Sequence, residues 1–169
     1  MKTSIDINLP ELTDILNPWR EETVELSKKG VPPHVSLIYP WLETPILKKE
    51  LKNIQKILEN TKTFTLEFDS IKKFDNGTTY FSPSNTNELK EIQNKIMKKY
   101  PTIKMYNGEF KDTIFHLTIA KIGDDEEKFL EIQNKLSKYL PIKKEITQVT
   151  IMQEDKNGYW STCLDINFK

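Results

Sequence analysis

Two short runs decide the fold of this chain: Pro33-His34-Val35-Ser36-Leu37-Ile38, and Phe115-His116-Leu117-Thr118-Ile119-Ala120 in its second half. Each run holds one of the chain's two histidines, followed after one apolar residue by a hydroxyl side chain. Runs so rich in apolar and β-branched residues predict buried strands. Strand side chains alternate between faces, so each histidine shares a face with the hydroxyl roughly 7 Å away. If the strands lie side by side, two proton-transfer groups and two hydroxyl donors converge. Such a set of groups is typical of a site that acts on a phosphoester.

The segments around these strands show helix and strand patterns in turn. Residues 4–9 alternate polar and apolar side chains, which predicts a strand with one wet face. A helix is expected next, with Asn17 as its N-cap, Pro18 at its first position and Gly30 just beyond its end. Further on, Asn76-Gly77 predicts a tight hairpin turn between two strands.

Three later segments show apolar side chains three and four residues apart, the pattern of an amphipathic helix. These stripes are Leu47, Leu51, Ile54 and Leu58; then Leu89, Ile92 and Ile96; then Phe129, Ile132, Leu136 and Leu140. Asn85 and Glu88 predict a capping box for the second of them, and Gly123-Asp124 precedes the third. The chain closes with a predicted hairpin of residues 146–152 and 159–168.

This order of elements predicts an α+β protein with mostly antiparallel sheet. The order strand, helix, histidine strand, helix, hairpin recurs in the second half without its first strand. We therefore expect a single domain over residues 1–169 with two pseudo-symmetric lobes, each with a sheet flanked by helices, around a central cleft. The two histidine strands would then occupy equivalent positions.

Composition narrows the classes of function. Lys+Arg and Asp+Glu both number 25, so the net charge is zero, and we expect no binding of long duplex nucleic acid. Cys163 is the only cysteine, which excludes an internal disulfide and a Cys-based zinc site. No apolar run approaches the length of a membrane helix, and the N-terminal residues lack the apolar core of a signal peptide. A cytoplasmic protein that does not interact with membranes is expected.

The two histidine motifs and their surroundings resemble the two-histidine (2H) phosphoesterase superfamily, near its 2′-5′ RNA ligase-like branch. The defining pair of His-x-Thr/Ser-x motifs stands here as His34-Val35-Ser36-Leu37 and His116-Leu117-Thr118-Ile119. The runs 30–41 and 77–81 and the closing Gly158-Tyr159-Trp160 are similar to the family's other motif regions. Ser36 replaces the commoner Thr, and Phe115 replaces a frequent Pro before the second histidine.

The resemblance implies a duplicated bilobal fold and a metal-independent phosphodiesterase without a cofactor. Its catalytic residues would be His34 and His116, one acting as base and the other as acid, in an order that the sequence leaves open. Ser36 and Thr118 would donate hydrogen bonds to the phosphate. Two histidines are also too few for a typical zinc site.

Other side chains are weaker candidates for substrate contacts. Aromatic residues near the motifs would stack on a nucleobase, although core packing explains them equally well; they are Tyr39, Trp41, Tyr80 and Trp160. Lys121 and Arg20 would meet a phosphate, or else remain solvated surface charges.

The expected substrate is a nucleotide or RNA-end phosphodiester that involves a ribose 2′ oxygen, either a 2′,3′-cyclic phosphate or a 2′-5′ linkage. A 2′-5′ linkage would also permit a reversible, ligase-like reaction. Two alternatives remain open at this point. One is a hydrolase of cyclic or oligonucleotide signalling molecules, including antiviral defence signals. The other is a binding module that captures a nucleotide without turnover.

Overall fold

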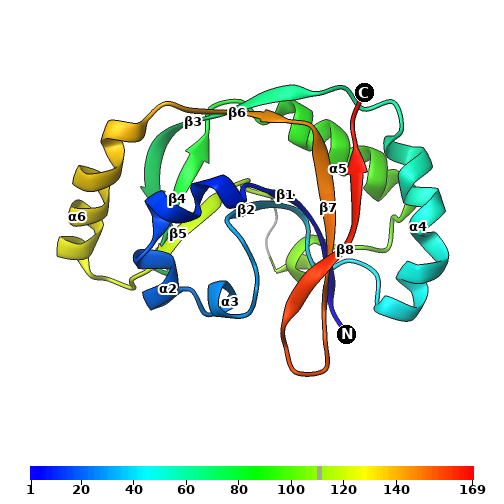
Figure 1. The fold of residues 1–169 in the computed structure, drawn as a ribbon, viewed down its shortest axis with the longest axis horizontal. Helices are drawn as coiled ribbons and strands as arrows, with labels where there is room; N and C mark the ends of the chain where they lie inside the picture. Colours follow the sequence, from blue (N-terminus) through cyan, green and yellow to red (C-terminus); the bar gives the residue numbers. More distant parts are fainter. Residues whose placement is uncertain (110–111) are drawn as a thin grey trace.

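The computed structural model describes residues 1–109 and 112–169, and its strands form one curved antiparallel sheet (Figure 1). Within the described residues eight strands pair in the order β6-β3-β4-β5-β2-β1-β7-β8. The strands are β1 (Thr3–Asn8), β2 (His34–Ile38), β3 (Phe64–Lys73), β4 (Thr78–Pro83), β5 (Leu117–Lys121), β6 (Ile142–Ile146), β7 (Gln148–Glu154) and β8 (Trp160–Asn167). The predicted α+β class with antiparallel pairing is confirmed.

The two histidine strands meet at the centre of this sheet. β2 and β5 are antiparallel neighbours, with Val35 opposite Leu117, and this contact joins the two halves. The two separate sheets expected from the sequence are therefore connected into one ladder. One hydrophobic core extends through both halves, and the single domain with two pseudo-symmetric lobes stays a prediction.

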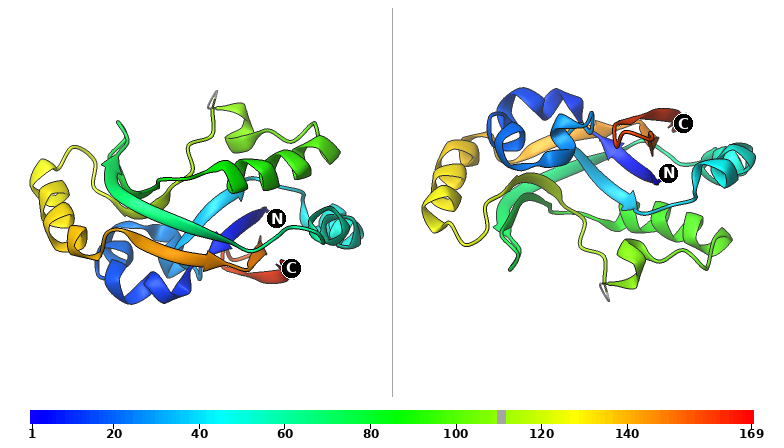
Figure 2. Two further views of the ribbon diagram at one scale, coloured as in Figure 1. Left: turned by 90° about the horizontal axis from the view of Figure 1, so that it is seen from above. Right: turned by 90° about the horizontal axis from the view of Figure 1, so that it is seen from below.

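Helices cover the two ends and sides of the sheet. The longer ones are α4 (Thr44–Leu58), α5 (Asn87–Lys99) and α6 (Glu126–Leu136); the short ones are η1 (Pro10–Leu12), α1 (Thr13–Leu16), α2 (Trp19–Thr23), α3 (Glu25–Lys28), η2 (Met105–Gly108) and η3 (Ser137–Tyr139). α4 and α6 lie at opposite ends of the molecule (Figure 1), and α5 lies on the side opposite α2 and α3 (Figure 2). No helix among the described residues is long and apolar enough to span a bilayer.

The predicted apolar stripes form the buried faces of α4 and α5. The third stripe is correct only in part, because Leu140 lies beyond the end of α6 and Phe129 is half-buried. In α4, Leu47, Ile54 and Leu58 are fully buried, and Leu51 packs against the same core. Burying each such side chain contributes about 1.5–3 kcal/mol relative to leaving it in water. Gln93 of α5, which is not part of the apolar stripe, donates a side-chain hydrogen bond to the Leu37 carbonyl of β2 at 2.7 Å. This bond fixes α5 against the first histidine strand.

The single helix predicted after Asn17 is wrong. The chain forms α1, α2 and α3 instead, because Asn17 (ψ 144°) and Val24 (ψ 101°) have extended backbones that interrupt helical hydrogen bonding. An extended residue before a proline is the usual consequence of the clash with the proline ring. These breaks let the short α2 approach β5, with which it packs.

The wet face predicted for the first strand is also wrong. β1 lies between β2 and β7, and the polar residues Ser4 and Asp6 are only 4 % and 2 % exposed. Alternation did identify the two faces of the strand. The polar face, however, forms the floor of a cavity and is covered by neighbouring elements, so these side chains are buried.

The β3–β4 hairpin gives a test of close backbone packing. Gly77 has φ +79°, and a β-carbon there would overlap the backbone of Gly123, whereas a β-carbon on Gly123 (φ +59°) would meet nothing within 4 Å. Both Gly→Ala variants incur backbone strain, but only Gly77→Ala adds an overlap. We expect Gly77→Ala to lower the free energy of unfolding by at least about 2 kcal/mol more than Gly123→Ala in urea titrations. Equal losses would contradict this packing.

Candidate active site

The two histidines are held by the same local device. His34 begins β2 and His116 directly precedes β5, and in each the Nδ1 atom lies 2.8 Å from the carbonyl oxygen two residues earlier, Pro32 or Ile114. A carbonyl only accepts hydrogen bonds, so Nδ1 carries the proton in the neutral ring. Nε2 is thereby left as the nitrogen that exchanges protons.

Strand register brings the four motif side chains together. Val35 and Leu117 are a cross-strand pair and fully buried, so His34 neighbours Thr118 and Ser36 neighbours His116 on the opposite face. Diagonal positions in such a pair lie roughly 7–8 Å apart, which leaves room for one phosphate between the imidazoles. All four side chains line one cavity of about 530 Å³.

The side chain of Arg20 connects the two histidine segments by hydrogen bonds to their backbone carbonyls. Its guanidinium donates to the Thr118 carbonyl at 2.9 Å and to the carbonyls of Val31 and Pro32 at 3.2 and 3.3 Å. The side chain is 1 % exposed, so the expectation of a surface charge is wrong. Burial lowers the pKa of Arg20 to about 10, so it remains charged at neutral pH. Arg20 also lines the cavity, and its donors bind backbone.

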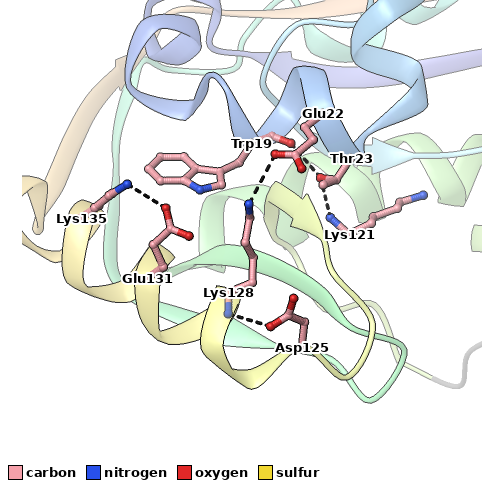
Figure 3. A network of polar contacts seen from close by, with 8 residues as sticks. All are labelled: Trp19, Glu22, Thr23, Lys121, Asp125, Lys128, Glu131 and Lys135. Carbon is pink, nitrogen blue, oxygen red and sulfur yellow. Dashed lines mark hydrogen bonds and ion pairs between the residues drawn. The ribbon is translucent and has the colours of Figure 1, made fainter.

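α2, which carries Arg20, is itself fixed by polar contacts with β5 and α6 (Figure 3). Thr23 Oγ1 accepts from the Lys121 backbone at 3.0 Å, and Lys128 forms an ion pair with Glu22 at 3.4 Å. The Lys121 side chain points away from this network and lines the cavity. Exposed pairs of this kind contribute little energy each. The Thr23 hydrogen bond positions α2 relative to β5, and the ion pair connects α2 to α6.

An aromatic wall surrounds His116. The rings of Phe74 and Tyr80 lie edge-on to the imidazole, with centroids 5.1 and 5.4 Å away. Burial, and to a lesser extent the nearby charge of His34, lower the pKa of His116, although the Ile114 carbonyl partly opposes them. The neutral form of His116 is therefore favoured near pH 7.

The predicted substrate-contact residues separate into two groups. Tyr39, Trp160 and Lys121 line the cavity, whereas Trp41 and Tyr80 do not. Trp41 is buried in the core and packs edge-on against Tyr100. Tyr80 is buried as well, and its ring lies edge-on to the imidazole of His116. Core packing is thus the better interpretation for both of them.

Sequence reasoning missed three groups in the cavity. Tyr106 packs against Tyr39, with ring centroids 6.2 Å apart, and it lies in a short helix without an apolar period. Asp75 and Asp112 are exposed at the rim. Asp6 also lines the cavity; the alternation of residues 4–9 marked the face on which it lies, but the sequence did not show that this strand pairs with the first histidine strand. Within the described residues no group of three or more His, Cys, Asp or Glu is placed to hold a metal ion.

Comparison with known proteins decides the family. The model of the 2′-5′ RNA ligase superfamily matches residues 10–158. The chain belongs to the 2′-5′ RNA ligase superfamily. Its members are 2H phosphoesterases, so the resemblance seen in the two motifs is confirmed, and membership supports an enzyme of the phosphoesterase kind.

Three solved structures have the same fold as this chain. E. coli LigT in complex with 3′-AMP superposes with a TM-score of 0.66 at 12 % identity, covering 99 % of this chain and 98 % of LigT. TT0787 of Thermus thermophilus superposes with a TM-score of 0.63 at 11 % identity, again covering 99 % and 98 %. A further structure described as a phosphoesterase gives 0.63 at 13 % identity and the same coverage. No curated protein matches the chain in sequence.

The contribution of the Arg20 hydrogen bonds to stability can be tested by substitution. Hydrogen bonds from a charged donor contribute about 1.5–3 kcal/mol each, and removing the guanidinium leaves three carbonyls without it. We expect Arg20→Ala to lower the free energy of unfolding by more than about 3 kcal/mol, with Arg20→Lys intermediate because an ammonium lacks the planar fork. Lys128→Ala, which removes an exposed ion pair, is the control. Equal stability of Arg20→Ala and Lys128→Ala would contradict the contribution assigned to the Arg20 hydrogen bonds.

The pKa of His116 can be measured directly, because the chain has two histidines and their NMR signals are assigned by single substitution. We expect His116 to titrate below 6.5 and its pKa to rise when His34→Gln removes the neighbouring charge. Because the pKa of His116 is higher in the unfolded chain than in the folded protein, the unfolded chain takes up this proton at a higher pH. The stability that His116 contributes is therefore complete above about pH 6.5 and declines below it. A pKa above 6.5 would contradict the burial argument.

Proposed function

We propose that this chain is a metal-independent phosphodiesterase that opens a nucleotide phosphodiester involving a ribose 2′ oxygen, with a 2′,3′-cyclic phosphate as the best-fitting substrate and a 2′-5′ linkage as the next. The observation that carries the proposal is the convergence of both histidines, Ser36 and Thr118 on one cavity of about 530 Å³. A cavity of this size suits one phosphate with its nucleoside.

The charges of the cavity favour a substrate with few phosphates. Lys121 is its exposed lysine, and the guanidinium of Arg20 is bonded to backbone carbonyls. Asp75 and Asp112 at the rim would repel additional phosphates. This balance disfavours a large signalling oligonucleotide. E. coli LigT has been crystallised with 3′-AMP, ATP and NADP⁺, which supports a nucleotide as the ligand here as well.

The proposed mechanism uses His116 as base and His34 as acid. Neutral His116 takes a proton at Nε2 from a water molecule, and the water oxygen forms a bond to phosphorus. The bond from phosphorus to one ribose oxygen breaks, and that oxygen takes a proton from Nε2 of His34. The product is a phosphate monoester, and solvent restores both protonation states. In the reverse direction the two roles exchange.

Ser36 and Thr118 would stabilise the negative charge that develops on the non-bridging oxygens. They lie on different strands, one beside each histidine, so a phosphate between the imidazoles would receive a donor from each side. Tyr39 and Trp160 would hold the nucleoside. Trp160 lines the cavity although it is only 8 % exposed, so it would contact the nucleoside through its ring.

The proposal is tested by product formation in the presence of a chelator. The panel contains a 2′,3′-cyclic nucleotide, 2′-5′ and 3′-5′ dinucleotides, and cyclic di- and trinucleotides. We expect turnover of the first or second class, and a reduction of roughly 10²–10⁴-fold in His34→Ala and in His116→Ala. The control is Glu127→Gln, an exposed residue of α6 that does not line the cavity, with unchanged activity.

Each other outcome contradicts a specific part of the proposal. Full activity in either histidine variant would remove the acid–base assignment. Turnover of cyclic oligonucleotides alone would favour a signalling hydrolase. Binding of every nucleotide without turnover would favour a binding module. Activity that is lost in chelator and restored by added metal would overturn the metal-independent mechanism.

A further inference from the structure

Asp6 lies at the floor of the cavity in an environment unusual for a carboxylate. It is 2 % exposed, and Ser4 donates a hydrogen bond to its Oδ2. Its Oδ1 is buried and has no hydrogen-bond partner within the described residues. Thr150, opposite Asp6 on β7, donates instead to Asp165 at 2.7 Å.

Asp6 is also the cross-strand neighbour of Ser36, the proposed phosphate donor. The two residues are paired in the β1–β2 register, so their side chains leave the sheet on the same face. A serine hydroxyl has one hydrogen to donate. If Asp6 were ionised, that hydrogen would be drawn to the carboxylate and would not be available to a phosphate.

The surroundings favour the neutral acid. Burial raises the pKa of Asp6, and this effect outweighs the lowering by His34, Ser4 and Ser36. Among the described residues, neither nearby cationic side chain donates a hydrogen bond to the Asp6 carboxyl, because the Nδ1 atom of His34 bonds to Pro32 and the guanidinium of Arg20 bonds to backbone carbonyls. Tyr106 also lines the cavity, and burial raises its pKa to about 12, so its hydroxyl stays neutral and supplies no charge that would affect Asp6. A phosphate in the cavity would disfavour a second negative charge further.

We propose that Asp6 is a positioning residue that acts, as a neutral carboxylic acid, through Ser36. Oδ2 accepts from Ser4, the acid hydrogen on Oδ1 is donated to Ser36 Oγ, and the Ser36 hydrogen is then directed into the cavity toward the phosphate. In this arrangement Ser4, Asp6, Ser36 and the phosphate would form a chain in which every donor has one acceptor, and Ser36 would be the partner that Oδ1 lacks among the described residues. This inference rests on the proposed function, to which it adds the residue that orients the phosphate donor.

Asp6→Asn is the decisive variant, because an amide placed with its oxygen toward Ser4 and its NH₂ toward Ser36 preserves every step of the chain. We expect Asp6→Asn to retain kcat/KM for the 2′,3′-cyclic nucleotide within about 3-fold of wild type. Asp6→Ala and Ser36→Ala should both lower kcat, by about 10²–10³-fold for Ser36→Ala and by at least about 10-fold for Asp6→Ala. Because Asp6 acts through Ser36, the double variant Asp6→Ala/Ser36→Ala should be no slower than Ser36→Ala.

The opposite results are equally clear. A loss in Asp6→Asn as large as in Asp6→Ala would overturn the inference and indicate that an ionised carboxylate, for example one that stabilises protonated His34, is required. Losses that multiply in the double variant would show that Asp6 does not act through Ser36. Urea titration shows which variants are folded. If Asp6→Ala is not folded, a loss of more than about 10-fold in Asp6→Asn relative to wild type overturns the inference.

A binding measurement separates this inference from the proposed function. Inorganic phosphate is titrated into each variant while the two histidine signals are followed by NMR. Phosphate that binds wild type and Asp6→Asn equally, and Asp6→Ala at least several-fold more weakly, supports the chain of hydrogen bonds even if no substrate in the panel is turned over. Equal binding to wild type and Asp6→Ala would overturn it even if the phosphodiesterase activity is established.

Discussion

The buried guanidinium of Arg20 is the interaction on which the arrangement of this site depends. The two histidine motifs come from distant parts of the chain, and β2 and β5 meet at Val35 and Leu117. Arg20 adds a second connection, since it binds the Thr118 carbonyl on one side and the Val31 and Pro32 carbonyls on the other. The Pro32 carbonyl is also the acceptor for His34, so one contact fixes both the strands and an imidazole. Enclosure keeps these bonds strong, because water does not compete for them.

The same enclosure gives the two histidines different surroundings although their local geometry is alike. Each Nδ1 bonds to the carbonyl two residues earlier, but only His116 has aromatic rings edge-on to it among the residues that the structure describes. Phe74 and Tyr80 come from either side of the β3–β4 hairpin turn, so the packing of Gly77 against Gly123 affects the wall around His116. The fold thereby gives two residues of the same type different environments, which is the basis for the separate acid and base roles proposed for them.

The sequence predicted the elements whose signal is local. The alternation around His34 and His116 identified the faces of both strands, and the periodicity of Leu47, Ile54 and Leu58 identified the buried face of α4. It did not separate Tyr39 and Trp160, which line the cavity, from Trp41 and Tyr80, which do not, because that difference depends on neighbours distant in the chain. Asp6 was assigned to a wet face and Arg20 was expected at the surface for the same reason: burial of a charged residue requires partners that one-dimensional patterns do not reveal.

The central claim is that His34 and His116 perform different proton transfers at one phosphate, and a change of leaving group tests it most directly. A nucleoside phosphodiester with a p-nitrophenyl leaving group does not need an acid, because p-nitrophenolate departs without protonation. We expect His34→Ala to recover most of its activity on this ester relative to wild type, whereas His116→Ala stays impaired. Equal impairment of both variants on the activated ester would contradict the assignment of separate acid and base roles.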